Sequence, residues 1–361
     1  MRIGIAIDKL AKFHGIQRVV FELARMLRRR NKITLITFED RCSEELIRRF
    51  KKIRVEFLFF KYKNFISSRK YSLKEYAKEI SKSNLDIINS HGPILGTASS
   101  LSNIPTVLTY HGITKPFNFF NYFWWLSMYL NYLPSVYLAD KVVAISRYIK
   151  KELETYYRRK DCIVIYNGID TRKFKPSKKL GRKFREKFSI KEDEVLVGYV
   201  GREAPHKNHE FLIKLTKKLG VKLVLVGPTS LKGDKDVYII PKLSEKELVG
   251  FYNTIKIYAH PSLWEGFGLP LLEAQACGKP VVAFNKCAMR EVVIHGKTGY
   301  LANNSREFKF YLKKLLSNVE LRAKFGINAL RFVQKFKVED FSSLYEKVFY
   351  FYKTLRTKEH K

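Results

Sequence analysis

Short apolar runs alternate with longer segments in which apolar residues recur at helical spacing, from one end of the chain to the other. This alternation is typical of βαβ units, which build parallel sheets. The runs fall into two sets. The strands expected in the first set are 2–7, 33–38, 55–58, 87–89, 106–110, 141–144 and 162–166. Those expected in the second set are 195–200, 222–226, 237–239, 257–259, 280–283 and a short strand near Tyr300.

The segment between the two sets is rich in lysine and arginine and contains Pro176 and Gly181, which favours a linker. After Asn304 the pattern is helical to the C-terminus. The predicted divisions are an N-terminal domain 1–172, a linker 173–193, a C-terminal domain 194–337 and a final helix 338–361 that crosses back to the N-terminal domain. The fold class is therefore α/β, with two Rossmann-like, doubly wound parallel-sheet domains facing across a cleft, and ligands should bind beyond the carboxyl ends of the strands.

The composition fits two packed domains. The chain has 361 residues, of which 46% are hydrophobic and 14% aromatic, and this excludes a disordered chain. Its four cysteines are too few and too scattered for a disulfide framework or a CxxC metal pair, so we expect a reducing compartment. The first apolar run meets Asp8 too soon for a signal peptide. A cytoplasmic protein is expected.

The longest apolar segment, 116–138, leaves three readings open. It is about long enough to span a membrane, but asparagines interrupt it, Pro134 falls near its end, and aromatic residues outnumber aliphatic ones. It could be a transmembrane helix, a surface that lies in a membrane interface, or a buried core helix.

The positive charge is large and evenly spread. Lysine and arginine number 69 against 34 acidic residues, and 69 − 34 gives +35. Residues 1–172 carry 31 − 15 = +16 and residues 173–361 carry 38 − 19 = +19. A nucleic-acid-binding module more often concentrates its charge, so this spread favours attraction to anionic ligands or surfaces, or simply a solvated lysine-rich surface. Basic clusters at 28–32 and 48–54 add the hypothesis of an anionic membrane.

One segment carries most of the candidate chemistry, PSLWEGFGLPLLEA at 261–274. It follows a predicted strand and enters a predicted helix, with Pro270 suited to the first turn. A Gly266-Phe267-Gly268 turn at a helix start exposes backbone N–H groups that bind anions. Glu265 and Glu273 frame the turn, and carboxylates accept hydrogen bonds from paired sugar hydroxyls. The alternative is that Glu265 caps the helix and Glu273 lies on a solvated face.

EGFGLPLLEA, continued by QACGKPVVAF and REVVIHGKTGYL, resembles the E-x7-E region of glycosyltransferase family 4, which has the GT-B fold; Glu265 and Glu273 have the seven intervening residues. Further matching pieces, in the expected order, are a glycine loop at Gly15, TYHG around His111, ADKVVAISRYIKKEL, VIYNGIDTRKFKP, VGYVGREAPHKNHEFLIK and LRAKFGINALRFVQKF. The resemblance covers nearly the whole chain. It implies a retaining glycosyltransferase that uses a nucleotide-diphosphate sugar.

The resemblance also implies roles for single residues. Arg202 and Lys207 would clamp the donor diphosphate, and two fixed cations can stabilise a leaving nucleoside diphosphate without a metal ion. Glu273 would hold the ribose hydroxyls and Glu265 would lie by the transferred sugar. The other donor-binding residues implied in this segment are Gly266, Phe267, Gly268 and Leu269.

In the N-terminal domain, the resemblance places His111 beside the sugar and the reaction centre, although a lone histidine is often structural. Gly15 would let its loop approach the diphosphate closely. Family members often have two adjacent glycines there, whereas this chain reads His14-Gly15-Ile16, so the resemblance does not define the donor or acceptor contacts of this loop in detail.

Four further motifs are not assigned to catalysis. Asp234-Lys235-Asp236 has the letters of a metal site but also reads as a lysine-rich loop, and His206 and His209 flank Lys207 without forming a convincing metal pair. We therefore expect no metal and no cofactor beyond the donor substrate. Asn167-Gly168-Ile169-Asp170 reads as a structural turn, and 239–243 should line the pocket for the nucleotide base.

The function that we predict is transfer of a sugar to a hydroxyl acceptor, such as a lipid-linked or membrane-surface glycan. The basic N-terminal domain and the aromatic segment favour an acceptor presented at a membrane, with the enzyme peripheral on its inner face. The alternatives are a catalytically silent sugar-nucleotide-binding protein, a basic nucleic-acid-binding protein, and a phosphorylase of the same fold. We expect no nucleic acid partner.

Overall fold

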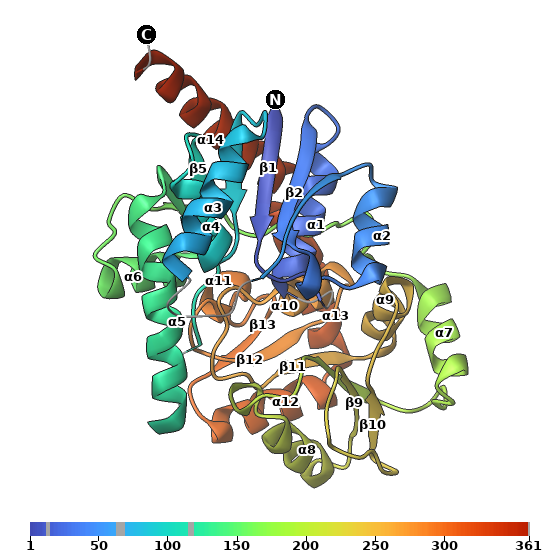
Figure 1. The fold of residues 1–361 in the computed structure, drawn as a ribbon. Coiled ribbons are helices and arrows are strands. Elements are labelled where there is room, and N and C mark those ends of the chain that lie inside the picture. Colours follow the sequence, from blue (N-terminus) through green and yellow to red (C-terminus); the bar gives the residue numbers. More distant parts are fainter. Residues whose placement is uncertain (12–14, 63–68, 115–118, 360–361) are drawn as a thin grey trace. The chain divides into compact units, whose positions relative to one another are not determined.

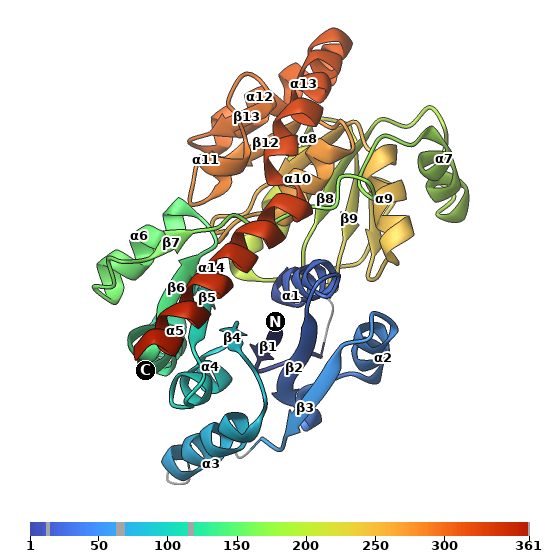
Figure 2. The same cartoon turned by 90° about the horizontal axis from the view of Figure 1, so that it is seen from above.

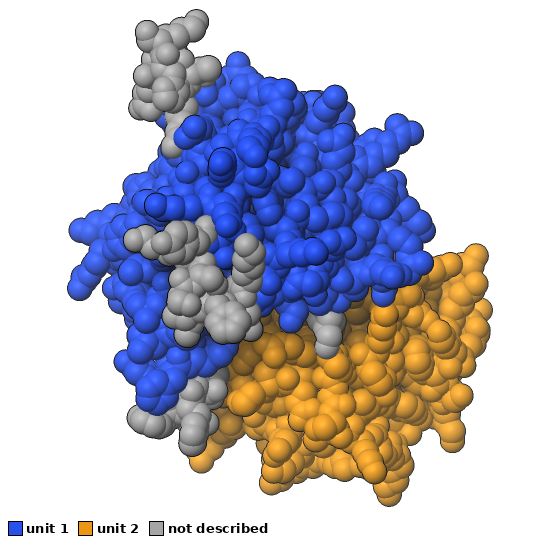
Figure 3. Space-filling view, viewed as in Figure 1, with its two compact units in different colours: residues 1–168, 338–361 blue, residues 169–337 orange. Residues whose placement is uncertain are grey.

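The computed structural model describes residues 1–11, 15–62, 69–114 and 119–359 of the chain (Figure 1). The chain divides into two compact units, coloured separately in Figure 3. Unit 1 contains Met1–Gly168 and Val338–Lys361, and unit 2 contains Ile169–Lys337. Each unit is built on its own parallel sheet.

Unit 1 has a seven-stranded sheet in the order β3-β2-β1-β4-β5-β6-β7, with every pair of neighbours parallel. Its strands are β1 (Arg2–Ile7), β2 (Lys32–Phe38), β3 (Glu56–Phe60), β4 (Ile87–Ser90), β5 (Thr106–Tyr110), β6 (Lys141–Ala144) and β7 (Ile163–Val164). In the register, Ile5 of β1 lies opposite Leu35 on one side and Asn89 on the other. The strand order therefore reverses beside β1, and ligand sites of α/β sheets form at such a point.

Helices cover both faces of this sheet. They are α1 (Gly15–Leu27), α2 (Glu44–Lys52), α3 (Arg69–Lys82), α4 (Pro93–Ser100), α5 (Phe119–Leu138), α6 (Arg147–Tyr156) and α14 (Val338–Glu359), with a short 3₁₀ turn η1 (Glu39–Arg41). α14 packs beside α1, while α3 and α4 cover the other face and α5 packs on α4 (Figure 2). The core between the sheet and α3 and α4 consists of Ala6, Ile36, Phe38, Tyr76, Ile80, Ile88, Leu95, Ala98 and Ile104.

Polar contacts fix α14 to the N-terminal part of the chain. The Tyr345 hydroxyl lies 2.9 Å from Thr109 Oγ1, and both residues are buried. Asn31 Nδ2 donates to Glu346 Oε1 at 2.8 Å. Phe349 is also fully buried on the same helix. The final helix is thus part of the core of unit 1.

Unit 2 has a six-stranded parallel sheet in the order β10-β9-β8-β11-β12-β13. Its strands are β8 (Leu196–Val200), β9 (Lys222–Val226), β10 (Val237–Ile240), β11 (Ile257–His260), β12 (Val281–Phe284) and β13 (Gly299–Ala302). Its helices are α7 (Lys178–Lys187), η2 (Pro205–Lys207), α8 (His209–Lys218), α9 (Glu245–Thr254), α10 (Leu269–Ala276), α11 (Met289–Val292), α12 (Ser305–Ser317), α13 (Val319–Phe332) and η3 (Val333–Phe336). The predicted fold class, α/β with two doubly wound parallel sheets, is confirmed.

The segment that we predict as a linker, 173–193, contains α7. Ser177 Oγ caps this helix by accepting a hydrogen bond from Leu180 N at 3.3 Å. Thr254 of α9 donates to the Gly181 carbonyl at 3.0 Å. A Cβ at Gly250 would lie 2.8 Å from the Leu180 carbonyl, so a glycine is needed where the two helices meet. The segment therefore packs within unit 2.

Helix α5 holds the long aromatic segment, whose residues 116–118 lie outside the described part of the chain. Among the helices of the described residues, none combines the length and the apolar character that crossing a bilayer requires. Phe123, Trp124 and Leu130 of α5 are exposed, whereas Tyr132 and Val136 are buried. The helix therefore carries exposed aromatic side chains as well as buried ones.

Candidate functional site

The predicted donor-binding residues of unit 2 lie at the point where its strand order reverses. β8 pairs with β9 on one side and with β11 on the other. The loop after β8 carries Arg202 and Lys207, and the loop after β11 carries Glu265 and the turn at Gly266 and Gly268. Because the carboxyl ends of neighbouring parallel strands meet at one edge of the sheet, the two loops are adjacent, which is the usual place for a ligand in such folds.

An ion pair between Lys207 and Glu265 forms the centre of the site. Lys207 Nζ donates to Glu265 Oε1, and the two side chains are only 15% and 12% exposed. His260 Nε2 lies 2.9 Å from the same oxygen. Burial raises the pKa of Glu265, but the Lys207 ammonium and the His260 ring outweigh it and hold that pKa well below its usual range. Glu265 is therefore ionised at neutral pH.

His260 orients this carboxylate and was not predicted from the sequence. It ends β11 and is completely buried. Burial lowers the pKa of His260 although Glu265 raises it, so the ring is neutral at pH 7. A neutral ring facing a carboxylate carries its proton on Nε2 and donates it. The available signal was a histidine at the end of a predicted strand, five residues before Glu265.

Arg202 adds a second cation beside the ion pair. It is exposed and, within the described residues, makes no hydrogen bond or ion pair. Burial, helped by the charges of Lys207 and Arg202, lowers the pKa of His206 to about 4, so both cations act on one ring. A Cβ at Gly227 would lie 2.3 Å from the Gly201 carbonyl, so the loops after β8 and β9 approach as closely as only glycine allows. This close approach fixes the position of the loop that carries Arg202 and Lys207.

The turn at 266–268 leads directly into α10, whose first residue is Leu269. Gly268 is the N-cap residue, with φ +97 and ψ 51 and no side-chain cap. This left-handed backbone favours glycine, and a Cβ would lie 2.8 Å from Leu271 Cδ1. Phe267 is buried and packs edge-on against Phe336, so only its backbone can face a ligand. The N-cap residue is Gly268 and the Glu265 carboxylate is held by Lys207 and His260, so Glu265 does not cap this helix.

Glu273 lies one turn into α10 and is buried. The Tyr252 hydroxyl of α9 donates to Glu273 Oε2 at 2.7 Å. The alternative in which Glu273 is a solvated face residue is therefore wrong. Tyr252 is a site residue that the sequence did not reveal, because it lies 21 residues away along the chain.

The other two predicted site residues, Gly15 and His111, belong to unit 1. Gly15 is the first residue of α1, with φ +27, and a Cβ there would have no neighbour within 4 Å; the preceding residues 12–14 lie outside the described part of the chain. His111 follows β5 and is buried. Its Nε2 lies 2.9 Å from Nδ1 of His91, which follows β4.

Two of the remaining motifs form local turns. Asp234 pairs with Lys217, and its Oδ1 accepts from Asp236 N at 2.9 Å in the turn before β10. Asp170 Oδ1 accepts from Arg172 N at 3.1 Å, which makes a local turn after Asn167. The rings of His206 and His209 are both buried, and the segment 239–243 begins in β10 and continues beyond its carboxyl end.

Two family models match this chain. The model "Glycosyltransferase Family 4" matches residues 13–173, and the model "Glycosyl transferases group 1" matches residues 182–332. The second range contains all the candidate residues of the unit 2 site.

Individual proteins agree with the family models. An uncharacterized glycosyltransferase of Methanocaldococcus jannaschii is 28% identical, over 82% of this chain and 89% of that protein. A capsular polysaccharide biosynthesis glycosyltransferase of Staphylococcus aureus is 27% identical, over 69% of this chain and 72% of that protein. The structure of Anabaena HepE in complex with UDP-glucose superimposes with a TM-score of 0.80 at 21% identity, over 96% and 99% of the two chains.

Proposed function

Because this chain belongs to the family 4, group 1 glycosyltransferases of the GT-B fold, we propose that it transfers a sugar from a nucleotide-diphosphate sugar to a hydroxyl acceptor with retention of configuration. The observation that carries the proposal is the partly buried pair of Lys207 and ionised Glu265, with Arg202 exposed beside it at the strand-order reversal. Two cations and one fixed carboxylate suit a ligand with a diphosphate at one end and hydroxyls at the other.

The cations bind the diphosphate in this proposal. Negative charge develops on the leaving nucleoside diphosphate as its bond to the sugar breaks. Arg202 and Lys207, preorganised toward it, stabilise that charge more in the transition state than in the ground state. These two charges take the part that a divalent cation plays elsewhere, and a bound metal is not required.

The carboxylates bind hydroxyl groups. Glu273, fixed by the Tyr252 hydroxyl, accepts hydrogen bonds from the ribose, and Glu265, fixed by His260, accepts them from the transferred sugar. The family resemblance assigns donor contacts to the backbone of 266–269 and to Gly15, and a role at the sugar to His111. A uridine donor is supported by the UDP-glucose bound in Anabaena HepE.

Retention is proposed to proceed by attack on the face that the diphosphate leaves. The bond between the anomeric carbon and the phosphate oxygen breaks, the acceptor oxygen forms its bond on the same face, and the acceptor proton goes to the released phosphate. Such a step needs no second carboxylate ~5 Å from the first, unlike retaining hydrolysis.

A sugar-nucleotide screen by thermal shift tests the donor assignment. At a concentration ~100 times the dissociation constant, a ligand of the folded state adds ~2.7 kcal/mol of stability, which raises the midpoint of a unit of this size by roughly 5 to 10 °C. We expect such a rise with UDP-glucose or another nucleotide-diphosphate sugar, and also with EDTA present. No shift with any sugar nucleotide would contradict the proposal.

We further propose that the acceptor is presented at an anionic membrane surface, as on a lipid-linked glycan. Exposed aromatic side chains on α5 support this, with Phe123 57% and Trp124 53% exposed. Exposed basic residues, among them Lys151 on α6 and Lys160 after it, lie in the neighbouring segment. Aromatic rings at the headgroup level together with basic side chains suit binding in the interface of an anionic bilayer.

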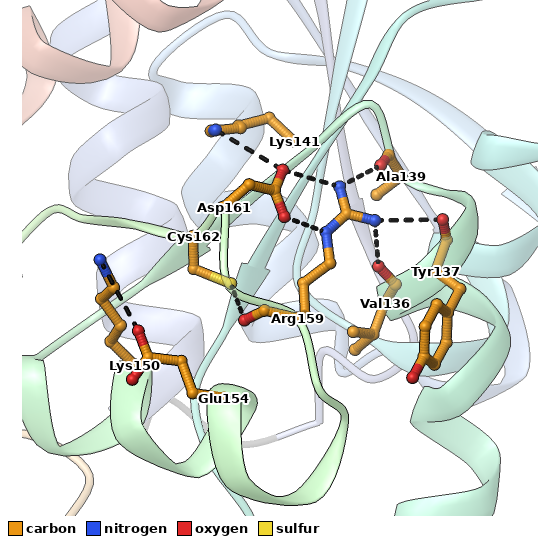
Figure 4. Close-up of polar contacts among 9 residues, drawn as sticks. All are labelled: Val136, Tyr137, Ala139, Lys141, Lys150, Glu154, Arg159, Asp161 and Cys162. Carbon is orange, nitrogen blue, oxygen red and sulfur yellow. Dashed lines mark hydrogen bonds and ion pairs between the residues drawn. The ribbon is translucent and has the colours of Figure 1, made fainter.

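The end of α5 is fixed firmly to the segment after α6 (Figure 4). The Arg159 guanidinium donates to the carbonyls of Val136, Tyr137 and Ala139 at 3.1 to 3.2 Å, which satisfies the C-terminal end of the helix. Asp161 holds the same guanidinium at 2.6 Å. Arg159 therefore fixes the C-terminal end of α5 to the segment that carries Lys160.

Vesicle binding tests this surface. We expect the protein to sediment with vesicles containing phosphatidylglycerol at low salt, and the double variant Phe123→Ser, Trp124→Ser to bind them ~10-fold or more weakly, because two large apolar groups no longer enter the interface. Phe310→Ser is the matched control, since Phe310 is 59% exposed but lies on α12 of unit 2. Efficient transfer to a soluble acceptor without vesicle binding would contradict a membrane acceptor.

A further inference from the structure

A chain of hydrogen bonds in unit 1 starts from an amide whose orientation is fixed. Asn89 Nδ2 donates to the Val107 carbonyl at 2.9 Å and to Thr109 Oγ1 at 2.9 Å. A backbone carbonyl only accepts hydrogen bonds, so the amide nitrogen must face it. Asn89 Oδ1 then faces the opposite way, where it lies 2.7 Å from His91 Nε2.

The fixed amide sets the protons on two histidines in turn. Asn89 Oδ1 only accepts, so His91 Nε2 carries a proton and donates it. His91 is buried as a neutral ring, so its Nδ1 is an acceptor, and His111 Nε2 at 2.9 Å must donate to it. His111 is then left with a lone pair on Nδ1, which has no hydrogen-bond partner among the residues that the structure describes.

Both rings stay neutral over the physiological range. Burial, together with the neighbouring His111, holds the pKa of His91 well below its usual range. Burial lowers the pKa of His111 to about 3. The causes of the two shifts are burial and, for His91, the neighbouring His111 ring, while the Asn89 amide supplies a neutral polar contact.

We propose that Asn89 and His91 are positioning residues that hold His111 as a neutral imidazole with its proton on Nε2, so that Nδ1 accepts a hydrogen bond from a hydroxyl group of the substrate. The role of His111 at the substrate rests on the proposed function. The tautomer itself does not, because it follows from the contacts within unit 1.

The direct test is the tautomer of His111, read from long-range ¹⁵N–¹³C NMR spectra of histidine-labelled protein without ligand. We expect a protonated Nε2 and an unprotonated Nδ1, unchanged between pH ~5 and ~8. A proton on Nδ1, or titration within that range, would overturn the proposal. Failure of the proposed function would appear instead as no response to any sugar nucleotide, with the tautomer still as expected.

Variants separate positioning from simple support of the fold. His91→Phe keeps a planar ring but removes the acceptor, and Asn89→Leu removes the acceptor one step earlier; in both, His111 should become a mixture of tautomers. In Asn89→Asp, a protonated carboxyl group can donate to the Val107 carbonyl and keep an acceptor oxygen facing His91 Nε2, so the wild-type tautomer should be retained. His209→Phe, which replaces a buried histidine in unit 2, should leave the His111 signals unchanged.

The same variants connect the tautomer to catalysis. With the donor found by the thermal shift screen, we expect His91→Phe and Asn89→Leu to lower kcat ~10-fold or more, because a wrong tautomer presents a donor where an acceptor is needed. Asn89→Asp should instead keep most of the wild-type kcat. An unchanged His111 tautomer in Asn89→Leu, or equal losses in Asn89→Leu and Asn89→Asp, would overturn the positioning role.

Discussion

Replacing Lys207 by alanine is expected to lower turnover by ~10² or more, because one of the two charges that stabilise the leaving diphosphate is lost. A second effect adds to the first. Without the ammonium, burial raises the pKa of Glu265 with only His260 opposing it, so the carboxylate is less fully ionised and less fixed. The measurement is kcat and KM for the donor identified by thermal shift, together with the melting midpoint of the free variant.

Lys214→Ala is the matched control for Lys207→Ala. Lys214 also pairs with a glutamate, Glu210, but both side chains are largely exposed on α8, so its loss should change neither turnover nor stability appreciably. If Lys207→Ala kept wild-type turnover while folding normally, the assignment of the diphosphate to this loop would be lost.

Glu273→Gln is expected to weaken binding of the nucleotide roughly 10- to 100-fold. Hydrogen bonds to a charged group are worth about 1.5 to 3 kcal/mol, and each 1.4 kcal/mol is a factor of ten in the dissociation constant. Glutamine keeps the size of the side chain and an oxygen that can accept from the Tyr252 hydroxyl, so the fold of α10 should persist. Calorimetric titration with UDP and with UDP-glucose gives the two dissociation constants.

Comparison of the two ligands locates the contact in Glu273→Gln. A carboxylate that holds the ribose is needed equally by UDP and UDP-glucose, so both should lose the same factor. Glu210→Gln on α8 serves as the control for loss of an acidic charge. Weaker binding of UDP-glucose alone would place Glu273 at the sugar instead of the ribose.

The fold could be read from the sequence because parallel strands buried on both faces are continuous apolar runs. The expected strands 2–7, 106–110 and 222–226 coincide with β1, β5 and β9. The segment 173–193 was harder to interpret. Most of the lysines and arginines of α7 are exposed. The packing of this helix on α9 depends on Gly181 and Gly250, and the sequence does not reveal that role until the helices are placed.

Some residues of the candidate site can likewise be recognised in the sequence, and others cannot. Arg202, Lys207, Glu265 and Glu273 stand in motifs that a continuous sequence displays. Tyr252, which holds Glu273, and His91, which contacts His111, do not, because they gain meaning only from contacts that folding creates. Tyr252 lies 21 residues from Glu273, and His91 lies 20 residues from His111. No local pattern encodes a hydrogen bond across that separation.

The return of α14 to unit 1 has a consequence for synthesis on the ribosome. All of unit 2 is translated before residues 338–359, whereas unit 1, although begun first, still lacks the helix that buries Tyr345 and Phe349. Domains generally fold as units during translation. The half of the enzyme that is made first therefore matures last, and a premature stop codon before α14 would destabilise the amino-terminal half while leaving the carboxy-terminal half intact.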